Sequence, residues 1–173
     1  MTGVDEEGAP VIAGMSPSRF REVLGHFASG LTVVTALDGG GPVGFTCQAF
    51  MSLSLDPPLV ALAPGKSSTT WPRIAPGGRF CANVLSDDQE ALCRDFAVSG
   101  ADKGDKFQGV GWSPGPGGVP VLDGVLAWVA CDISRSYDAG DHVLVIGAVV
   151  DTGVERGRRP LIFYRGGFGS FES

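Results

Sequence analysis

The sequence predicts a mainly β fold whose strands form a barrel, with a few short helices. Seven or so strand-like runs follow one another with turn residues between them, the helical segments are short, and strands and helices do not alternate as βαβ units would. The chain of 173 residues has the length of one domain. We expect a single domain over residues 16–173, preceded by a flexible N-terminal tail over residues 1–15.

The first expected element is a short helix that follows this tail. Residues 1–15 contain glycine, proline and three acidic residues without a hydrophobic period. Ser16 and Pro17 then have the pattern of a helix cap followed by a first-turn proline. Apolar residues recur at the spacing of one helix face up to about residue 29, so we expect this helix to lie on the core. The face consists of Phe20, Val23, Leu24 and Phe27.

Strand signals dominate the rest of the chain. Residues 31–36 and 43–46 have strand composition, and the turn residues at 38–42 between them predict a β-hairpin. Residues 51–55 alternate strictly, which puts serine hydroxyls on one face, and residues 59–63 form a continuous apolar run. Further strands are expected at residues 79–85, 125–135, 142–151 and 161–164.

Two more helices and a long loop separate these strands. Residues 66–74 are interpreted as a short helix, and residues 86–89 form a capping box that opens a helix through Phe96. Residues 100–119 contain seven glycines and two prolines, which predicts a long loop. Loops of this length are often functional.

The charge and composition exclude several classes of function. The formal net charge is −6 and basic residues are not clustered except at residues 156–159, so sequence-independent nucleic-acid binding is not expected. The apolar runs are far shorter than a membrane span. The first basic residue is Arg19, so the N-terminus lacks the pattern of a secretory signal. We expect a cytoplasmic protein.

The four cysteines do not predict a metal site. They are separated by 34, 12 and 38 residues, without a C-x-x-C pair and with two histidines in the whole chain. Cys81 and Cys131 lie inside apolar strands, where a cytosolic thiol usually behaves as a small core residue.

Two glycine motifs resemble nucleotide-binding sequences without meeting their requirements. Gly39, Gly41 and Gly44 fit G-x-G-x-x-G, but the segment leads into a strand, whereas a dinucleotide fingerprint opens a helix. A Walker P-loop is excluded because Val60 stands where the motif that ends at Gly65 needs glycine. Residues 64–70 still place hydroxyls, Lys66 and backbone N–H groups at a helix start, which suits either a phosphate site or a capped surface helix.

Three other polar clusters are weaker signals by themselves. Residues 46–49 leave a strand end, and residues 105–107 close the glycine-rich loop. Taken singly, a turn and a solvated loop explain them better than a function does. His142 follows Gly140 and Asp141 at the start of a strand, where an imidazole either has a structural hydrogen bond or takes part in function.

Taken together and in order, these clusters resemble one family along almost the whole chain from Phe20 to Gly169. The sequence is similar to the short flavin reductases that supply reduced flavin to two-component monooxygenases. The resemblance rests on residues 27–35 (FASGLTVVT), 44–50 (GFTCQAF), 52–60 (SLSLDPPLV), 79–85 (RFCANVL), 105–107 (DKF), 140–142 (GDH) and 161–167 (LIFYRGG).

The resemblance implies a split β-barrel that binds FMN or FAD and forms a homodimer with the flavin near the subunit interface. It also implies two groups of site residues. Those expected at the flavin are Phe45, Thr46, Cys47, Gln48, Ala49 and Ser52 at the ring, Lys66, Ser67, Ser68, Thr69 and Thr70 at the phosphate, and Phe80, Asn83, Lys106 and Phe107 closing over the flavin. Those expected at the nicotinamide are Ser29, Gly30, His142, Tyr164, Arg165 and Gly166.

The resemblance implies an NAD(P)H-dependent flavin reductase, an oxidoreductase that passes reduced flavin to a partner monooxygenase. Hydride transfer between two bound rings needs orientation and no protein nucleophile, which agrees with the lack of a triad or metal cluster. His142 is the candidate for positioning the pyridine nucleotide. Ser29 and Gln48 depart from the family pattern, which leaves the preference between FMN and FAD open. The preference between NADH and NADPH is open as well. The alternatives are a flavoprotein with tightly bound flavin and a specific substrate, and a non-enzymatic flavin-binding module.

Overall fold

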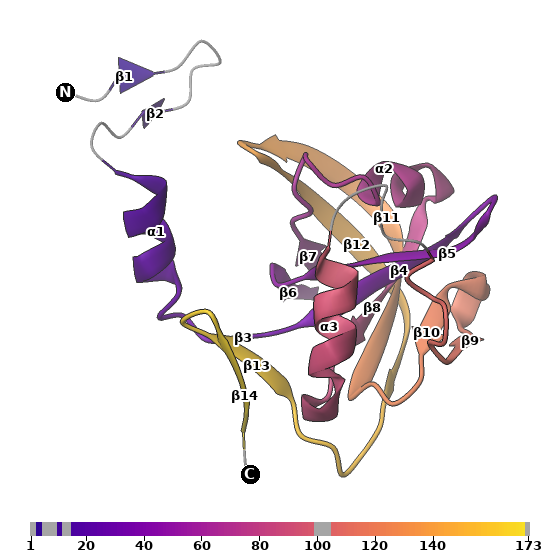
Figure 1. Ribbon diagram of the computed structural model, residues 1–173. Helices are drawn as coiled ribbons and strands as arrows, with labels where there is room; N and C mark the ends of the chain where they lie inside the picture. The colour runs from indigo at the N-terminus through magenta and orange to yellow at the C-terminus, as the bar shows by residue number, and fades with distance from the viewer. Residues whose placement is uncertain (1–2, 5–9, 12–14, 99–104, 172–173) are drawn as a thin grey trace.

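A computed structural model describes residues 3–4, 10–11, 15–98 and 105–171. Its main element is an antiparallel sheet of seven strands in the order β5-β4-β8-β11-β12-β7-β6 (Figure 1). The strands are β4 (Thr32–Asp38), β5 (Gly41–Cys47), β6 (Phe50–Leu55), β7 (Pro58–Leu62), β8 (Arg79–Val84), β11 (Ala127–Ala139) and β12 (His142–Val154). The prediction of a mainly β fold with a few short helices is confirmed.

Smaller elements surround this sheet. A second sheet of three strands has the order β14-β13-β3, and two-stranded ladders join β1 to β2 and β9 to β10. Their bounds are β1 (Gly3–Val4), β2 (Pro10–Val11), β3 (Ser29–Gly30), β9 (Trp112–Pro114), β10 (Pro120–Leu122), β13 (Leu161–Tyr164) and β14 (Gly167–Ser170). The helices are α1 (Pro17–Leu24), α2 (Trp71–Ile74) and α3 (Glu90–Ala97), with 3-10 turns at Ala75–Gly77, Asp87–Gln89 and Pro116–Gly118.

The connection between β5 and β6 shows that the seven-stranded sheet is rolled. These strands are its two edges, yet Gln48 and Ala49 alone join them. In a flat sheet the edges would be roughly 29 Å apart at about 4.8 Å per strand, whereas such a connection spans only about 10 Å. The two edges therefore meet at residues 47–50, a curvature that a split barrel requires.

The predicted hairpin and the two long strands are present. Residues 32–36 and 43–46 belong to β4 and β5, and Gly41 has a φ of 130° next to the turn. The G-x-G-x-x-G match is therefore a hairpin turn, as expected. The predicted strands at 125–135 and 142–151 become β11 and β12, whose pairing continues to the Ala139–His142 pair at the hairpin tip.

Two sequence predictions about residues 66–119 are corrected. The helix expected at 66–74 is limited to Trp71–Ile74, because the preceding residues bond elsewhere: Lys66 N–H donates to the Asp141 carbonyl, and Ser68 Oγ accepts from the Trp71 N–H. The second half of the predicted loop forms the β9–β10 hairpin, whose turn uses positive φ at glycine positions 117 and 118. Residues 99–104 lie outside the described residues.

The core has two main clusters. One lies against β4, β5, β7 and β8 and includes the fully buried side chains of Phe80, Ile74 and Val145. The other packs α3 against β4 and β13 and includes Phe96 and Leu161. All four cysteines are buried free thiols, as expected for Cys81 and Cys131.

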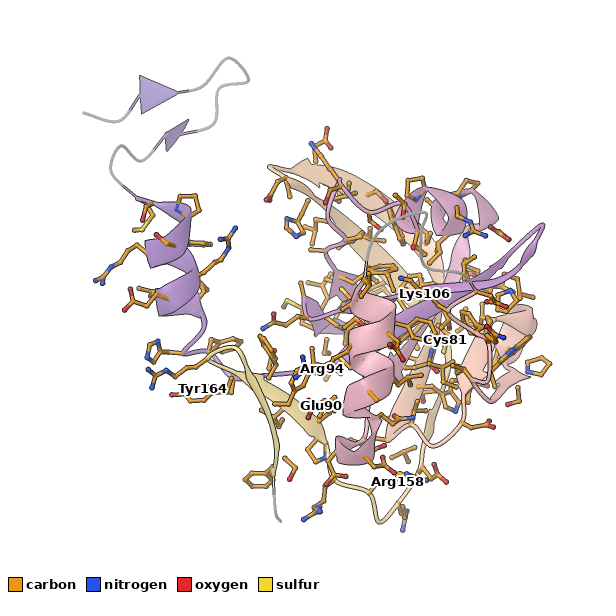
Figure 2. The ribbon with its side chains drawn as sticks, viewed as in Figure 1. Cys81, Glu90, Arg94, Lys106, Arg158 and Tyr164 are labelled. Atoms are coloured by element: carbon orange, nitrogen blue, oxygen red, sulfur yellow. The ribbon has the colours of Figure 1, made fainter. Side chains whose placement is uncertain are left out.

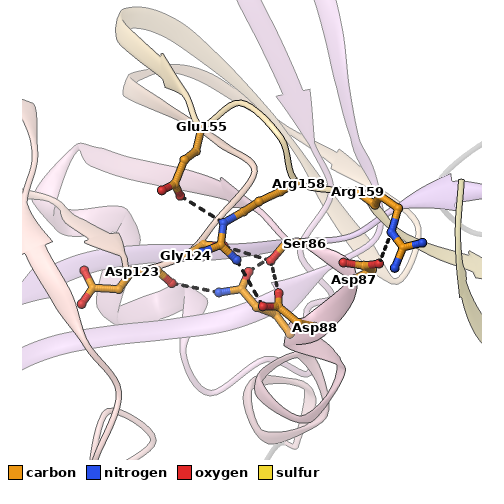
Figure 3. Close-up of polar contacts among 9 residues, drawn as sticks. Ser86, Asp87, Asp88, Asp123, Gly124, Glu155, Arg158 and Arg159 are labelled. Carbon is orange, nitrogen blue, oxygen red and sulfur yellow. Dashed lines mark hydrogen bonds and ion pairs between the residues drawn. The ribbon is translucent and has the colours of Figure 1, made fainter. Parts of the chain in front are cut away.

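A polar cluster fixes the start of α3 (Figure 3). The capping box is present: the Ser86 hydroxyl accepts from the Gln89 backbone, and Gln89 Oε1 accepts from Ser86 N at 3.1 Å. Arg158 pairs with Asp88 at 3.1 Å, and Arg159 Nε pairs with Asp87 at 2.8 Å. These contacts join the segment that follows β12 to the N-terminal end of α3.

Helix α1 begins where the sequence predicts but does not lie on the core. Ser16 Oγ accepts from the Arg19 N–H at 3.2 Å, as a helix cap does. None of the described residues of α1 is buried, and Figure 1 shows the helix standing away from the sheet. The apolar face is exposed, with Phe20 at 54% and Phe27, just beyond the helix, at 75%. The hydrophobic period identified the apolar face correctly, but the described part of the chain leaves this face exposed.

The flexible N-terminal tail over residues 1–15 stays a prediction. The ladder of β1 and β2 falls within residues 1–15, and the other residues before Met15 lie outside the described residues. In the described part of the chain, no helix has both the length and the apolar character needed to cross a bilayer.

Candidate functional site

A cavity of about 850 Å³, called the first cavity below, lies where the two edges of the rolled sheet meet. Five separate segments line it: the end of α1 with β3, residues 45–51, residues 61–70, the C-terminal end of α3 with Lys106, and the start of β12. Its size is within the range of small-molecule sites, roughly 300–1,000 Å³. Of the residues that the sequence places at the flavin, nine line this cavity: Phe45, Thr46, Cys47, Gln48, Ala49, Ser67, Ser68, Thr70 and Lys106.

The β5–β6 connection forms one wall with its backbone tied in place. Thr46 Oγ1 donates to the Cys93 carbonyl of α3 at 2.6 Å, and the Cys47 thiol points to the Ala49 carbonyl at 3.5 Å. Burial raises the pKa of the Cys47 thiol to about 11, so it stays protonated and is not a nucleophile at neutral pH. The polar side chains at 46 and 47 thus serve the protein's own structure as well as the cavity wall.

The loop at residues 65–70 forms a second wall. Ser67, Ser68 and Thr70 line the first cavity, whereas Lys66 is outside its lining and pairs with Asp138 at 3.2 Å. Ser68 Oγ accepts from the N–H groups of Thr70 and Trp71 at 3.2 and 3.1 Å. Because the following helix is one turn long, hydroxyls and loop N–H groups, rather than a helix dipole, are what this wall offers to an anion.

His142 lies beside the start of this loop and is held by its neighbour. Its Nδ1 is 2.7 Å from Asp141 Oδ1, and its backbone forms a bridge with Gly65. The hydrogen bond with His142 lowers the pKa of Asp141, so the carboxylate accepts and Nδ1 carries the proton. Nε2 is then the nitrogen left to interact with a ligand in the cavity.

Ser29, at the wall of the first cavity, carries a buried hydroxyl. Its Oγ is inaccessible and has no hydrogen-bond partner among the described residues. Buried hydroxyls are normally satisfied, and leaving one unpaired costs about 1–3 kcal/mol. Ser29 and Gly30 both line the first cavity, so the unpaired hydroxyl belongs to a residue of its wall.

The other predicted nicotinamide residues lie beside the cavity rather than in it. The Arg165 N–H donates to the Gly25 carbonyl at 2.9 Å, and the Tyr164 ring contacts His26 edge to face with centroids 6.3 Å apart. Figure 2 shows Tyr164 next to the end of α1. Tyr164, Arg165 and Gly166 therefore support the segment that leads to Ser29.

Phe80 and Asn83 are placed in the core, which corrects their expected position over the flavin. Both are fully buried on β8. Asn83 Nδ2 donates to the Val33 carbonyl at 3.1 Å, and its Oδ1 accepts from the Leu122 N–H at 2.9 Å. Phe80 lies within 3 Å of a Cβ built at Gly147, so that position needs glycine for the strands to pack around the ring. No residue of β8 lines the cavity, and the sequence alone does not show that both faces of this strand are covered by the core.

None of the three remaining predicted flavin residues lines the first cavity. Ser52 is outside the lining of the first cavity, although its neighbour Met51 is part of it. Thr69 and Phe107 line a second, more polar cavity that adjoins the first. Lining residues that the sequence prediction omitted are mainly apolar: Leu24, Phe27, Ala28, Phe50, Met51, Ala61, Leu62, Ala63, Pro64, Phe96, Ala97 and Leu144. Nothing in their local pattern distinguishes them from core residues.

Comparisons with known proteins identify the family of the chain. Residues 24–172 match the family described as flavin reductase like domain. The reductase subunit HsaB of a flavin-dependent monooxygenase from Rhodococcus jostii is 43% identical over 172 residues, covering 99% of this chain and 87% of that protein. The FMN reductase (NADH) SmoA from Agrobacterium fabrum is 40% identical over 161 residues, covering 93% and 90%.

A solved structure gives the same result for the fold. The NADH:FAD oxidoreductase SgcE6 of Streptomyces globisporus, in complex with NAD and FAD fragments, superposes with a TM-score of 0.85 at 34% identity. The match covers 95% of this chain and 98% of that one. With its mainly β fold and its rolled sheet around a ligand-sized cavity, the chain belongs to the flavin reductase like domain family.

Proposed function

We propose that this protein is an NADH-dependent flavin reductase that supplies reduced flavin to a monooxygenase partner. The observation that carries the proposal is the first cavity, which brings residues 29–30, 45–49, 67–68, 70 and 142 together from distant parts of the chain. Its relatives are named as reductase subunits and NADH-dependent flavin reductases, which supports both the reaction and the partner class.

The cavity fits a flavin in shape and chemistry. The wall formed by Phe45, Ala61 and Ala63 is apolar and suits the flat isoalloxazine ring, while Ser67 and Ser68 offer hydroxyls to the phosphate. Thr70 extends the same polar wall. We assign these groups to the flavin, and Ser29, Gly30 and His142 to the nicotinamide.

The protein's task in this reaction is orientation. When both are bound, the flavin ring accepts a hydride from the reduced nicotinamide. The chain has to stack two rings in contact and exclude competing arrangements, and such positioning accounts for a large part of the rate in reactions of this kind. The backbone N–H groups of residues 46–49 are fixed by the contacts of Thr46 and Cys47, so they form preorganised dipoles along one wall. His142, held through Nδ1 by Asp141, presents Nε2 toward the nicotinamide.

A homodimer explains the exposed face of α1. The side chains of Phe20, Val23 and Leu24 are each at least 50% exposed, and Phe27 continues their face. Because Leu24 and Phe27 also line the first cavity, a second copy seated on this face would lie beside the flavin. We expect the double substitution Phe20→Asp and Val23→Asp, outside the cavity lining, to give monomers in analytical ultracentrifugation. A double variant that still sediments as a dimer would contradict the assignment of this face to the dimer interface.

The reaction is tested by steady-state oxidation of NADH with a large excess of free flavin. We expect many flavin turnovers per protein molecule, and a higher KM for NADH in the His142→Ala variant with unchanged flavin binding. His26→Ala is the matched control, since His26 lies outside the cavity lining and bonds to the Glu22 carbonyl. NADH oxidation limited to one flavin per protein would contradict the release of reduced flavin. We keep the expectation that this occurs in the cytoplasm.

A further inference from the structure

Lys66 contacts the tip of the β11–β12 hairpin instead of lining a cavity. The resemblance implies a place for it at the flavin phosphate, yet it is outside the lining of both the first and the second cavity. Its Nζ lies 3.2 Å from Asp138 Oδ1, near the end of β11. The ammonium group is thus paired with the hairpin that carries His142.

The backbone joins the same two segments, which are residues 64–66 and the hairpin tip at residues 138–143. Two hydrogen bonds connect them: the Lys66 N–H donates to the Asp141 carbonyl at 2.8 Å, and the Val143 N–H donates to the Pro64 carbonyl at 3.0 Å. These bonds reach the turn and the β12 strand of the tip. The ion pair adds the β11 strand, so both strands of the tip are fixed to the loop.

Gly65 shows how closely groups assigned to the two ligands approach each other. Its backbone forms a bridge with His142. A Cβ built at Gly65 would lie 3.8 Å from His142 Nε2 and 3.6 Å from Ser67 Oγ. The imidazole nitrogen assigned to the nicotinamide and a hydroxyl assigned to the flavin phosphate therefore lie around one point of the loop. A shift of the hairpin tip along the loop would move one of these groups relative to the other.

We propose that Lys66 and Asp138 are positioning residues for the pyridine nucleotide: their ion pair fixes the hairpin tip to the loop and so sets the place of His142 Nε2. This inference rests on the proposed function. Both residues act through His142, and Lys66 has no contact with the flavin. The side chains are 45% and 85% exposed, so the effect has the scale of an exposed ion pair, about twofold to fivefold in affinity.

The opposite charges of the pair separate this role from a direct attraction for the ligand. NADH is an anion, so by charge alone the loss of the lysine would weaken its binding and the loss of the aspartate would strengthen it. If the two side chains act as a pair, Lys66→Met and Asp138→Asn both release the tip. We expect each to raise the KM for NADH about twofold to fivefold at saturating FMN. The double variant should raise it no further than Lys66→Met does, because the second substitution has no pair left to break.

Two further readouts distinguish positioning from a general loss of structure. The kcat should stay close to the wild-type value, whereas a loss of folded protein would lower kcat and leave the KM unchanged. Isothermal titration calorimetry with FMN, without NADH, should give the wild-type dissociation constant for both single variants. Lys66→Arg keeps the charge and should keep the wild-type KM for NADH.

A second exposed ion pair supplies the matched controls. Arg94 pairs with Glu90 at 2.8 Å on α3, and both side chains are outside the lining of the two cavities (Figure 2). Arg94→Met and Glu90→Gln remove charges of the same signs as the test variants do. Both should keep the wild-type KM for NADH.

Three results would overturn the inference. Changes of opposite sign in the KM for NADH would show that the two charges act directly on the ligand. Weaker FMN binding in Lys66→Met, with wild-type binding in Asp138→Asn, would assign Lys66 to the flavin phosphate. An unchanged KM in both variants would show that the backbone bonds hold the tip without the ion pair. In all three cases the wild type would still reduce free flavin with NADH, whereas failure of the proposed function would abolish that reduction.

Discussion

Ser29→Ala is expected to stabilise the ligand-free protein while weakening its function. The Ser29 hydroxyl is buried without a partner among the described residues, and an unpaired buried hydroxyl costs about 1–3 kcal/mol. Alanine removes this cost with little change in volume, so we expect a gain of about 1 kcal/mol, taking the lower end because the residue as a whole is half-buried. For a chain of this size that gain corresponds to a rise in Tm of about 2–4 °C.

The same substitution at Ser68 should have the opposite sign. Ser68 lines the same cavity, but its Oγ accepts two backbone N–H groups at the start of α2. Ser68→Ala leaves both without that partner and should lower stability by about 1–2 kcal/mol. Differential scanning calorimetry of the two ligand-free variants gives the comparison, and calorimetric titration with NAD⁺ should show roughly tenfold weaker binding for Ser29→Ala. A lower Tm for Ser29→Ala would refute the reasoning, because it would mean that the hydroxyl is already satisfied.

Three further predictions follow from the same geometry. Asp141→Ala should lower kcat/KM for NADH roughly threefold to tenfold by releasing the His142 ring, whereas an unchanged value would exclude a positioning role. Gly44→Ala should destabilise the fold by about 1–3 kcal/mol in urea unfolding, since a Cβ there lies 2.8 Å from the buried Phe96 ring; wild-type stability would contradict this packing. Burial raises the pKa of Cys47 from 9.0 to about 11, so its contribution to stability is complete below pH 9 and should decline by up to about 3 kcal/mol as the pH rises to 11. Unfolding free energies of the wild type and Cys47→Ala across this range test that prediction, and parallel curves would disprove it.

Local sequence signals predicted most of the fold because each depends on neighbouring residues. Alternation and turn glycines located β4, β5 and the long β11–β12 pair, and the capping box at Ser86 located α3. The helix expected at residues 66–74 is limited to Trp71–Ile74, because the contacts that decide this segment are not all with neighbouring residues. Its N–H groups bond to Ser68 Oγ and to the Asp141 carbonyl, and the second of these partners is more than 70 positions away along the chain.

The site could be predicted only in part, because tertiary structure decides which side chains of a strand or loop face the cavity. The connection at residues 46–49 and the loop at 67–70 carry distinctive residue types, so their place at the cavity could be expected. Asn83 also looked like a ligand-binding residue, yet it hydrogen-bonds to β4 and to Leu122 in the core. The exposed face of α1 shows a further limit, because a hydrophobic period does not reveal whether its partner surface belongs to the same chain.

The central claim is that the first cavity supports hydride transfer from NADH to a flavin. Anaerobic stopped-flow absorbance tests it most directly: the protein with oxidised flavin is mixed with NADH, and the loss of the oxidised flavin band is followed. We predict rapid bleaching that continues through an excess of free flavin and is slower in the His142→Ala variant. A protein that binds flavin but shows no bleaching with NADH would contradict the account.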